Sequence, residues 1–583
     1  MKFDLTNFLF KYEKFIPIAL FLIFLAVTLP GISWGAPSLW NPDELFWRVN
    51  MALGGEMKFD ETEPDYNYPS LPKHIMYGVA WLVKQAGGSP TDILVSARLI
   101  SVLLGGLVVI LIYQMTKMAS ANIYIRLLAA FLALSNTALA HNARFAHNDL
   151  YLLFFITLSL FALLKYRLSA HRLWMYLAFF AAGCAASSKY TGASFLAVLL
   201  IFFLIENRRS IRTDFLRALE TFFISVVLTV AGYVIGTPKS LLWMSFYFKR
   251  MIPAALRFAS YGRSPDSEIG FFGQWGTFRA AVGTWVYYLF LVAFAWFVIK
   301  LVLGALNKES KVSRLWHQRR VPQGDDTCTA LRTVQRRCKT LDSYFHISVQ
   351  SPRRKIIFTL LASIFIFDLP FWMSYNYVPR FFLPFLPMFA VLASLFVEDV
   401  AAFAQQRNYA FAVPVLSIVV IGMIVASFLQ VVSVALLFAN DARTQAGEFI
   451  ETLEPDTVLE YTLYPPSIPE NHFSKARNYQ IYLIKYPGET VPTNKAFPYN
   501  RGEDGLYDRG ADYLIVDSFT YERFSDSFIC ETNPVECEFF NKLIAGQTSL
   551  QLLASFEYDL PPYLPQISLA AVNPDIKIYA IPR

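Results

Sequence analysis

Residues 412–438 read AVPVLSIVVIGMIVASFLQVVSVALLF, a run of 27 residues without a charge. A helix needs roughly 20 mainly apolar residues to cross the hydrocarbon core of a bilayer, and this run is longer than that. Similar runs recur toward the N-terminus as far as residue 15. The whole chain is 55% hydrophobic and only 16% charged, whereas a soluble protein carries about a quarter charged residues. The sequence therefore predicts an integral membrane protein.

The apolar runs predict a mainly α-helical fold, a polytopic bundle of about eleven transmembrane helices. The first run follows three lysines, as a signal peptide would. We interpret it as a retained span, because no A-x-A-like cleavage site follows and further spans come soon after. No internal repeat or low-complexity tract is visible. The predicted spans are 15–31, 93–116, 127–141, 150–165, 174–188, 192–206, 220–237, 283–305, 356–375, 381–398 and 412–438.

The distribution of charge predicts the orientation of these spans. Residues 306–355 hold twelve Lys and Arg against four Asp and Glu, whereas residues 439–583 hold eleven against twenty-one. Positive charge stays on the cytoplasmic side, and every basic connection follows an even-numbered span. We therefore expect a cytoplasmic N-terminus, a basic cytoplasmic loop at 306–355 and an extracytoplasmic C-terminus. The net charge of +7 thus reflects topology, and we expect no nucleic acid partner.

This topology divides the chain into a transmembrane domain at 1–438 and a soluble extracytoplasmic domain at 439–583. A first extracytoplasmic loop at 32–92 has an apolar stretch at 71–83, which predicts an interfacial helix. In the tail, apolar or β-branched runs at 457–463, 479–484, 513–516 and 576–581 predict strands, and residues 441–453 and 534–544 predict helices. The sequence thus predicts a small α/β domain after the last span.

The five cysteines carry little chemistry. Cys530 and Cys537 could close a disulfide if the tail is extracytoplasmic, and the alternative of two free thiols stays open. A structural zinc site needs four ligands, and the tail offers only His472 besides them.

Charged residues of both signs gather at the predicted outer ends of the spans, where charge near a membrane is costly and indicates function. A carboxylate can remove a proton from an acceptor, while Arg and Lys bind phosphate. Structural alternatives remain open: Asn41 or Asp43 could cap a short helix, Asp149 could cap a span, and Arg380 could anchor the interface. The group comprises Asp43, Glu44, Arg144, His147, Asp149, Lys189, Lys239 and Arg380.

Several other activities lack their sequence motifs. There is no G-x-S-x-G turn of a serine hydrolase and no phosphate-binding loop of an ATPase. No D-x-D motif occurs in the first outer loop, so we predict no cofactor, and divalent metal dependence stays open. A secondary transporter or lipid flippase is the alternative function, although such proteins often show repeats and a charged site near the membrane midplane.

Six short motifs occur in a family-like order on the predicted outer side. They are NPDE at 41–44, YNYPSLPKH at 66–74, ARLISVLLG at 97–105, ARFAHND at 143–149, SKYTG at 188–192 and VPRFFLP at 378–384. In this order the chain resembles the GT-C superfamily of polytopic glycosyltransferases. It is most similar to family 39, which includes the protein O-mannosyltransferases and the lipid A aminoarabinose transferases. The sequence departs from that pattern at Leu45-Phe46-Trp47 and at Pro69-Ser70, which leaves the sugar and the acceptor open.

The resemblance implies a glycosyltransferase that moves a hexose or pentose from a polyprenyl-phosphate donor to an acceptor, with inversion, at the extracytoplasmic face. Asp43 would be the catalytic base, supported by Glu44. Arg98, Arg380 and Lys189 would bind the donor phosphate. The acceptor could be a protein, a lipid or a glycan. We expect the protein to reside in the plasma membrane of a bacterium. The residues that would position sugar or acceptor are Asp149, His147, Tyr68 and Lys73.

Overall fold

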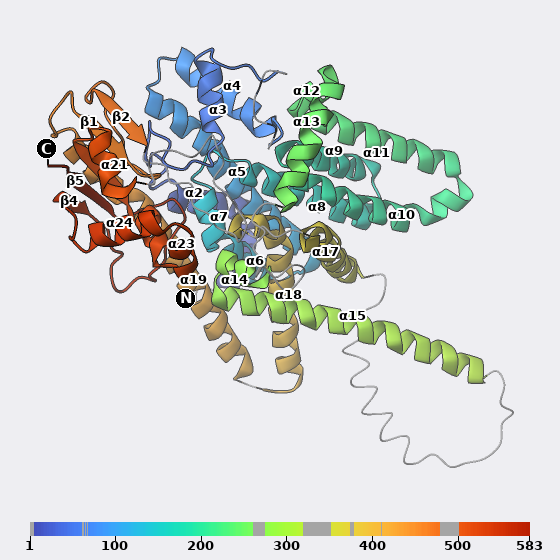
Figure 1. Ribbon diagram of the computed structural model, residues 1–583. Helices are drawn as coiled ribbons and strands as arrows, with labels where there is room; N and C mark the ends of the chain where they lie inside the picture. The colour runs from blue at the N-terminus through green and yellow to red at the C-terminus, as the bar shows by residue number, and fades with distance from the viewer. Residues whose placement is uncertain are drawn as a thin grey trace.

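The computed structural model describes residues 5–60, 63, 66, 68–260, 274–318, 351–373, 378–409, 411–478 and 501–582. Helices form a long bundle, and a smaller unit of strands and helices stands at one end of it (Figure 1). The mainly helical fold with a small C-terminal α/β domain is confirmed. The predicted strand at 479–484 and most of the predicted basic loop at 306–355 lie outside the described residues.

Within the described chain, eight helical segments are long and apolar enough to cross a membrane. The protein is thus an integral multi-pass membrane protein, while the number eleven stays a prediction. Each of the eleven predicted runs falls on a helix. The corresponding elements are α2 (Ile16–Thr28), α5 (Pro90–Ala119), α6 (Ile123–Leu134) with α7 (Thr137–Asn142), α8 (Asp149–Ser169), α9 (Arg172–Ser188), α10 (Phe195–Thr213), α11 (Phe215–Gly236), α15 (Thr284–Gln318), α17 (Pro352–Asp368), α18 (Leu386–Gln406) and α19 (Ala412–Ala439).

The third predicted span, 127–141, is wrong as a single helix. Helix α6 ends at Leu134, and the side chain of Asn136 accepts a hydrogen bond from the backbone N–H of Leu139 at 2.8 Å. Asn136 thereby caps the short helix α7, because its oxygen satisfies one of the N–H groups left over at a helix start. An apolar run can hide such a break, since the hydrophobic count is insensitive to one capping residue.

Small residues bring neighbouring spans into close contact. A Cβ atom at Gly183 of α9 would lie 2.1 Å from the backbone oxygen of Thr229, and one at Gly232 of α11 would lie 2.4 Å from that of Phe180. The two glycines therefore allow the backbones of α9 and α11 to meet, as is common where helices pack in a bilayer. This contact fixes the end of α9 that carries Lys189.

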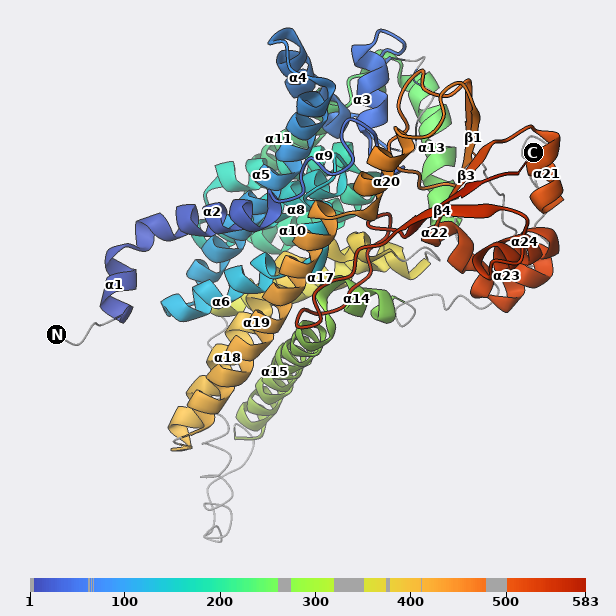
Figure 2. The ribbon, with the colours of Figure 1, turned by 90° about the vertical axis from the view of Figure 1, so that its left-hand side faces the viewer.

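Four shorter helices cover the same end of the bundle. Helix α4 occupies the stretch that was predicted to lie along the membrane interface, and Trp81 and Leu82 on it are exposed. The four are α3 (Phe46–Leu53), α4 (Leu71–Gln85), α12 (Lys239–Leu242) and α13 (Met244–Ser260). In Figure 2, α3, α4 and the tail domain lie at one end of the molecule, away from the free end of α1 (Leu5–Lys11).

The tail domain is built on a five-stranded mixed sheet with the strand order β2-β1-β3-β5-β4. Strands β1 to β3 pair in parallel, and β5 joins β3 and β4 antiparallel. Three strands and two helices fall on predicted segments; the polar edge strand β2 and the edge strand β4 were not predicted. The strands are β1 (Val458–Tyr461), β2 (Lys475–Asn478), β3 (Tyr513–Asp517), β4 (Gln551–Phe556) and β5 (Ile576–Ala580), and the helices include α20 (Ala442–Ile450), α21 (Gly502–Asp508) and α24 (Pro534–Ile544).

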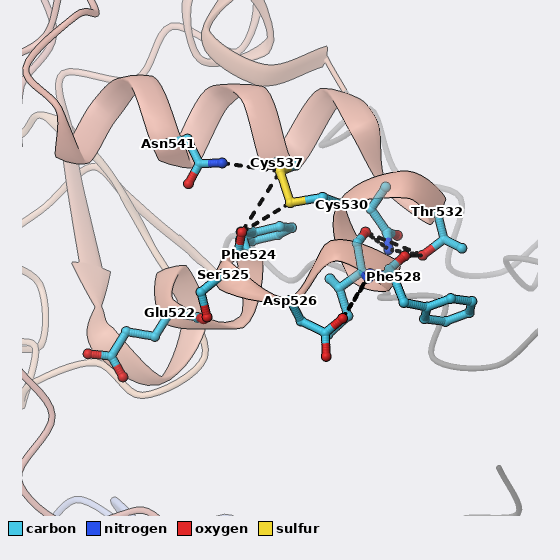
Figure 3. Close-up of a disulfide and its surroundings, with 11 residues drawn as sticks. Glu522, Phe524, Ser525, Asp526, Phe528, Cys530, Thr532, Cys537 and Asn541 are labelled. Atoms are coloured by element: carbon cyan, nitrogen blue, oxygen red, sulfur yellow. Dashed lines mark hydrogen bonds between the residues drawn. A yellow bond between two sulfur atoms is a disulfide. The ribbon is translucent and has the colours of Figure 1, made fainter. Parts of the chain in front are cut away.

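The tail also contains the predicted disulfide. Cys530 of α23 (Ser527–Thr532) is bonded to Cys537 of α24, with their Cα atoms 5.1 Å apart (Figure 3). The backbone oxygen of Phe524 lies 3.0 Å from the sulfur of Cys530, and the ring of Phe524 stacks on that of Phe540. The bond therefore fastens a short helix onto the aromatic core beside the sheet.

The tail domain is joined to the loop at 32–92 by a buried polar contact. The indole N–H of Trp34 donates to the carboxylate of Asp441 at 2.8 Å, and Arg443 binds the same carboxylate through two nitrogens at 2.8 and 2.9 Å. The guanidinium of Arg443 also lies over the ring of Trp40, 4.4 Å from its centre. The loop that carries the acid pair is thus held against the start of the tail.

Candidate active site

The acid pair lies in a turn that does not cap a helix. The side chain of Asn41 accepts the backbone N–H of Asp43 at 3.0 Å, and the backbone N–H of Leu45 donates to Ala146. Helix α3 begins after Leu45 with no side-chain cap. The helix-cap interpretation of the acids is therefore wrong, and both carboxylates are available for other contacts.

Asp43 is the exposed member of the pair. Its side chain is 51% exposed, and its carboxylate accepts a hydrogen bond from Nη2 of Arg380 at 2.8 Å. Arg380 comes from η4 (Pro379–Phe385), 337 positions away in the sequence. A carboxylate held by one cation at an accessible surface is free to accept a proton from an incoming group.

Behind Asp43 and Arg380 lies a buried cluster around Asp149, the first residue of α8. Its carboxylate lies 3.5 Å from Nε of Arg380 and 2.7 Å from Nζ of Lys189, the residue that follows α9. Nζ of Lys189 also lies 4.2 Å from the ring centre of Phe381. Asp149 therefore fixes the two cations side by side, with Arg380 bridging it to Asp43.

His147 completes this cluster in its neutral form. Its Nδ1 lies 2.8 Å from the carboxylate of Asp149. Burial lowers the pKa of His147; Asp149 opposes this effect, and Arg380 and Lys189 add to it. Its Nε2 is buried and has no hydrogen-bond partner among the described residues, and its ring meets that of Tyr68 edge to face at 5.7 Å. Such a nitrogen can accept a hydrogen bond from a hydroxyl group.

Glu44 has the opposite environment to Asp43. Glu44 and Arg98 are both fully buried, and two nitrogens of Arg98 reach the carboxylate at 2.7 and 3.2 Å. Nη1 of Arg98 donates to the backbone oxygens of Ile32 and Trp34. These contacts occupy the guanidinium, so the structure gives Arg98 a role in holding the loop rather than an open side for phosphate.

Lys73 lies in a second buried cluster that the sequence did not reveal. Glu63 is fully buried and bonded to both Lys73 and Lys239. Burial would raise the pKa of Glu63, but the two lysines outweigh it and hold that pKa below its usual value. Lys73 also donates to the backbone oxygen of Tyr68 at 3.3 Å. Glu63 was missed because its loop contains several other acids, and nothing in the sequence distinguishes Glu63 from them.

Arg144 is structural. Its three guanidinium nitrogens donate to the backbone oxygens of Val27, Pro30 and Ala140, at 2.7, 3.1 and 2.6 Å. Two of these oxygens lie at the C-terminal end of α2, where backbone carbonyls lack partners within the helix. A positive charge there also matches the helix dipole. The residue thus fixes the end of the first span.

The tail domain approaches the site through Tyr464. Burial raises the pKa of Tyr464; Arg523 opposes this, and the carboxylates of Asp517 and Asp43 add to it. The backbone N–H of Tyr464 donates to Asp517 at 3.1 Å, and its ring meets that of Phe519 edge to face at 5.3 Å. A tyrosine from the tail therefore lies within electrostatic range of Asp43.

A resident metal is the remaining question for this site. Among the residues that the structure describes, no three His, Cys, Asp or Glu side chains are grouped as metal ligands would be. Metal independence stays a prediction.

The fold and the site are those of an integral, multi-pass membrane protein with an acid-base cluster at one end of its helical bundle. Residues 46–236 match the family described as dolichyl-phosphate-mannose-protein mannosyltransferase. That range contains four of the six motifs and begins just after the acid pair. The resemblance to polytopic glycosyltransferases is thus confirmed for this part of the chain. No curated protein matches the chain.

Three solved structures illustrate what the chain resembles. ArnT from Cupriavidus metallidurans bound to undecaprenyl phosphate has 13% identity and a TM-score of 0.45, over 96% of this chain and 99% of that one. The Archaeoglobus fulgidus oligosaccharyltransferase in complex with Zn and sulfate has 12% identity and a TM-score of 0.44, over 93% and 72%. The S. cerevisiae protein O-mannosyltransferase Pmt1-Pmt2 complex bound to the sugar donor has 19% identity and a TM-score of 0.31, over 47% and 37%.

Proposed function

We propose that this protein is a membrane glycosyltransferase, which transfers a sugar from a polyprenyl-phosphate donor to an acceptor at the extracytoplasmic face, with inversion. The observation that carries the proposal is the half-exposed carboxylate of Asp43, held by Arg380 above the buried cluster of Asp149, Lys189 and His147. The match of residues 46–236 to a mannosyltransferase family supports the same class of reaction.

The proposed reaction is a single displacement at the anomeric carbon. Asp43 accepts the proton of an acceptor hydroxyl or amine as the acceptor atom forms its bond to that carbon. The bond from the carbon to the phosphate oxygen breaks, and the polyprenyl phosphate leaves with the electron pair. Since attack and departure occur on opposite faces, the configuration inverts.

Arg380 and Lys189 are the cations that we propose for the leaving phosphate. Asp149 holds them together, so that their charge is in place before the phosphate leaves. Arg98, which the resemblance implied as a third phosphate ligand, drops out of this proposal because Glu44 and backbone oxygens occupy it. Its role is to fix the loop beside Asp43.

The sugar would lie beside His147 and Tyr68. The free Nε2 of His147 can accept a sugar hydroxyl, and the Tyr68 ring offers an apolar face beside it. Lys73 would act at one remove, because it is bonded to Glu63 and holds the backbone of Tyr68. On the side from which the acceptor would approach, we propose that Tyr464 of the tail contacts it.

A reconstituted assay tests the proposal. The purified protein in lipid nanodiscs is given a panel of polyprenyl-phosphate hexoses and pentoses with extracted acceptors, and free polyprenyl phosphate is measured by mass spectrometry. Asp43→Asn should lower the rate about 10²- to 10⁴-fold, with the protein still folded. Glu56→Gln, which changes an exposed acid of the same loop, is the control and should retain full activity. Full activity of Asp43→Asn would overturn the assignment.

A further inference from the structure

The tail domain carries an uncharged loop beside the last span. Residues 560–569 read LPPYLPQISL, and we call this segment the proline loop. It lies between β4 and β5, and the nearest charged residues along the sequence are Asp559 and Asp575. In Figure 2 the dark-red chain leaves β4 and descends beside α19. A loop of a soluble domain that faced only water would usually carry polar or charged residues.

One contact sets the depth of the proline loop. The hydroxyl of Ser433 in α19 donates to the backbone oxygen of Pro565 at 2.9 Å. Ser433 lies six residues before Ala439, the last residue of α19, which corresponds to about 9 Å along a helix at 1.5 Å per residue. At Pro565 the proline loop therefore lies beside α19, about 9 Å back from the C-terminal end of this membrane-spanning helix.

The two faces of the proline loop differ. Leu560 belongs to the cluster that contains Leu437 and Phe438 of α19, and Ile567 and Leu569 pack against that cluster. On the other face, Tyr563 is 81% exposed. Helix α19 itself is mostly unburied, with apolar side chains such as Ile418 and Val425 exposed, so this region borders lipid. Tyrosine is the kind of side chain that gathers at the boundary between headgroups and acyl chains.

The backbone of the proline loop is adapted to an environment without water. Its three prolines have no N–H to satisfy, and the N–H of Leu564 donates to Pro561 at 2.9 Å. The side-chain amide of Gln566 donates to the backbone oxygens of Leu560, Pro561 and Leu564, at 3.4, 3.1 and 3.0 Å. Irregular backbone is tolerated at membrane depth only when its polar groups are satisfied by protein.

From these observations we infer that the proline loop is a membrane-contact site, which inserts Tyr563 into the extracytoplasmic lipid leaflet beside α19. The partner is the bilayer itself, at the level where headgroups meet acyl chains. The loop ties the tail domain to the membrane at a second place, apart from the contact between Trp34 and Asp441. This inference is independent of the sugar, the acceptor and the proposed reaction.

Site-directed fluorescence in nanodiscs tests the inference on the full chain. Cys184, Cys328 and Cys338 are replaced by alanine, the disulfide is kept, and Tyr563→Cys is labelled with an environment-sensitive fluorophore. Asp504→Cys is the matched control, because it is exposed on α21, which lies away from α19 in Figures 1 and 2. Lipids with a quencher near the headgroup should quench the label at 563 about two-fold or more above the label at 504.

A second measurement covers the case in which the label disturbs the loop. The unlabelled Tyr563→Cys variant is treated with a charged, membrane-impermeant thiol reagent in nanodiscs, and it should react about ten-fold more slowly than Asp504→Cys. Equal quenching and equal reactivity at the two positions would show that residue 563 faces water and would overturn the inference. Shielding at 563 without quenching by lipid would overturn it as well, because protein would then cover the loop.

Discussion

Asp43 and Glu44 are neighbours in the chain, and each is paired with an arginine from a distant helix, yet their surroundings are opposite. Asp43 is half exposed and shares Arg380 with Asp149. Glu44 and Arg98 are both fully buried, with backbone oxygens completing the shell. The difference shows that adjacent acids can divide two tasks: one pair shapes the loop, and the other is left open for chemistry.

The largest effect is expected from breaking the buried pair. Replacing Glu44 by Gln leaves the buried charge of Arg98 without its counter-charge, which should lower the free energy of unfolding by about 3–5 kcal/mol. Asp43→Asn should change it by less than about 1 kcal/mol, because an exposed pair contributes little. Thermal unfolding midpoints in detergent measure both. Equal losses in the two variants would contradict the division of tasks.

Next in size is the effect of Arg380 on turnover. Arg380→Ala should lower kcat about 10²- to 10³-fold, because in the proposed reaction it removes a donor to the leaving phosphate, on which negative charge develops. Arg380→Lys should recover part of this loss, since it restores the charge without the fork that reaches two carboxylates. The control is Arg353→Lys, whose arginine on α17 also binds two acids, Glu398 and Asp399, both on α18. That variant should keep its kcat.

The sequence predicted the helical bundle, the tail domain and the members of the cluster around Asp43. Long apolar runs, and charged residues at the ends of these runs, can be recognised directly in the sequence. It did not separate Asp43 from Glu44 in function, since burial depends on where Arg98 and Arg380 meet the loop. Glu63 was missed for the same reason, because nothing along the chain distinguishes a buried loop acid from a solvated one. The break at Asn136 was hidden in an apolar run.

A smaller effect tests whether the buried pair is anchored through the tail. Trp34→Phe keeps an aromatic ring but removes the N–H that reaches Asp441, whose carboxylate is buried. A hydrogen bond to a charged group contributes about 1.5–3 kcal/mol, and the unfolding free energy should fall by that amount. The backbone oxygen of Trp34 also accepts from Arg98, so kcat should fall while KM for the donor stays constant. Trp81→Phe, at an exposed position of α4, is the control and should leave both quantities unchanged.

The smallest effect concerns acid. Burial lowers the pKa of His147 and of His74 in the folded protein, whereas the unfolded chain takes up protons near the ordinary value of about 6.5. Below that pH the unfolded state therefore binds more protons, and stability falls as the pH drops, by at most about 1.4 kcal/mol per pH unit for each histidine.

Unfolding midpoints between about pH 7.5 and 5.5 measure this acid effect. His147→Asn should flatten the dependence, whereas His171→Asn, at an exposed position, should leave it unchanged. A steeper or identical slope in His147→Asn would show that its neutral form does not matter for folding. This test applies to the exposed pair of Asp43 and Arg380, because His147 belongs to the cluster beneath that pair and not to the buried pair of Glu44 and Arg98.

The contact between Trp34 and Asp441 also has a consequence for biosynthesis. Trp34 is synthesised directly after the first span, whereas its partner Asp441 follows 407 positions later. The carboxylate of Asp441 also accepts the backbone N–H of Asn573, which is synthesised later still. The loop bearing Asp43 can complete this contact with Asp441 only after the tail has been synthesised and has folded. We therefore expect a chain that lacks the tail to show none of the proposed transferase activity.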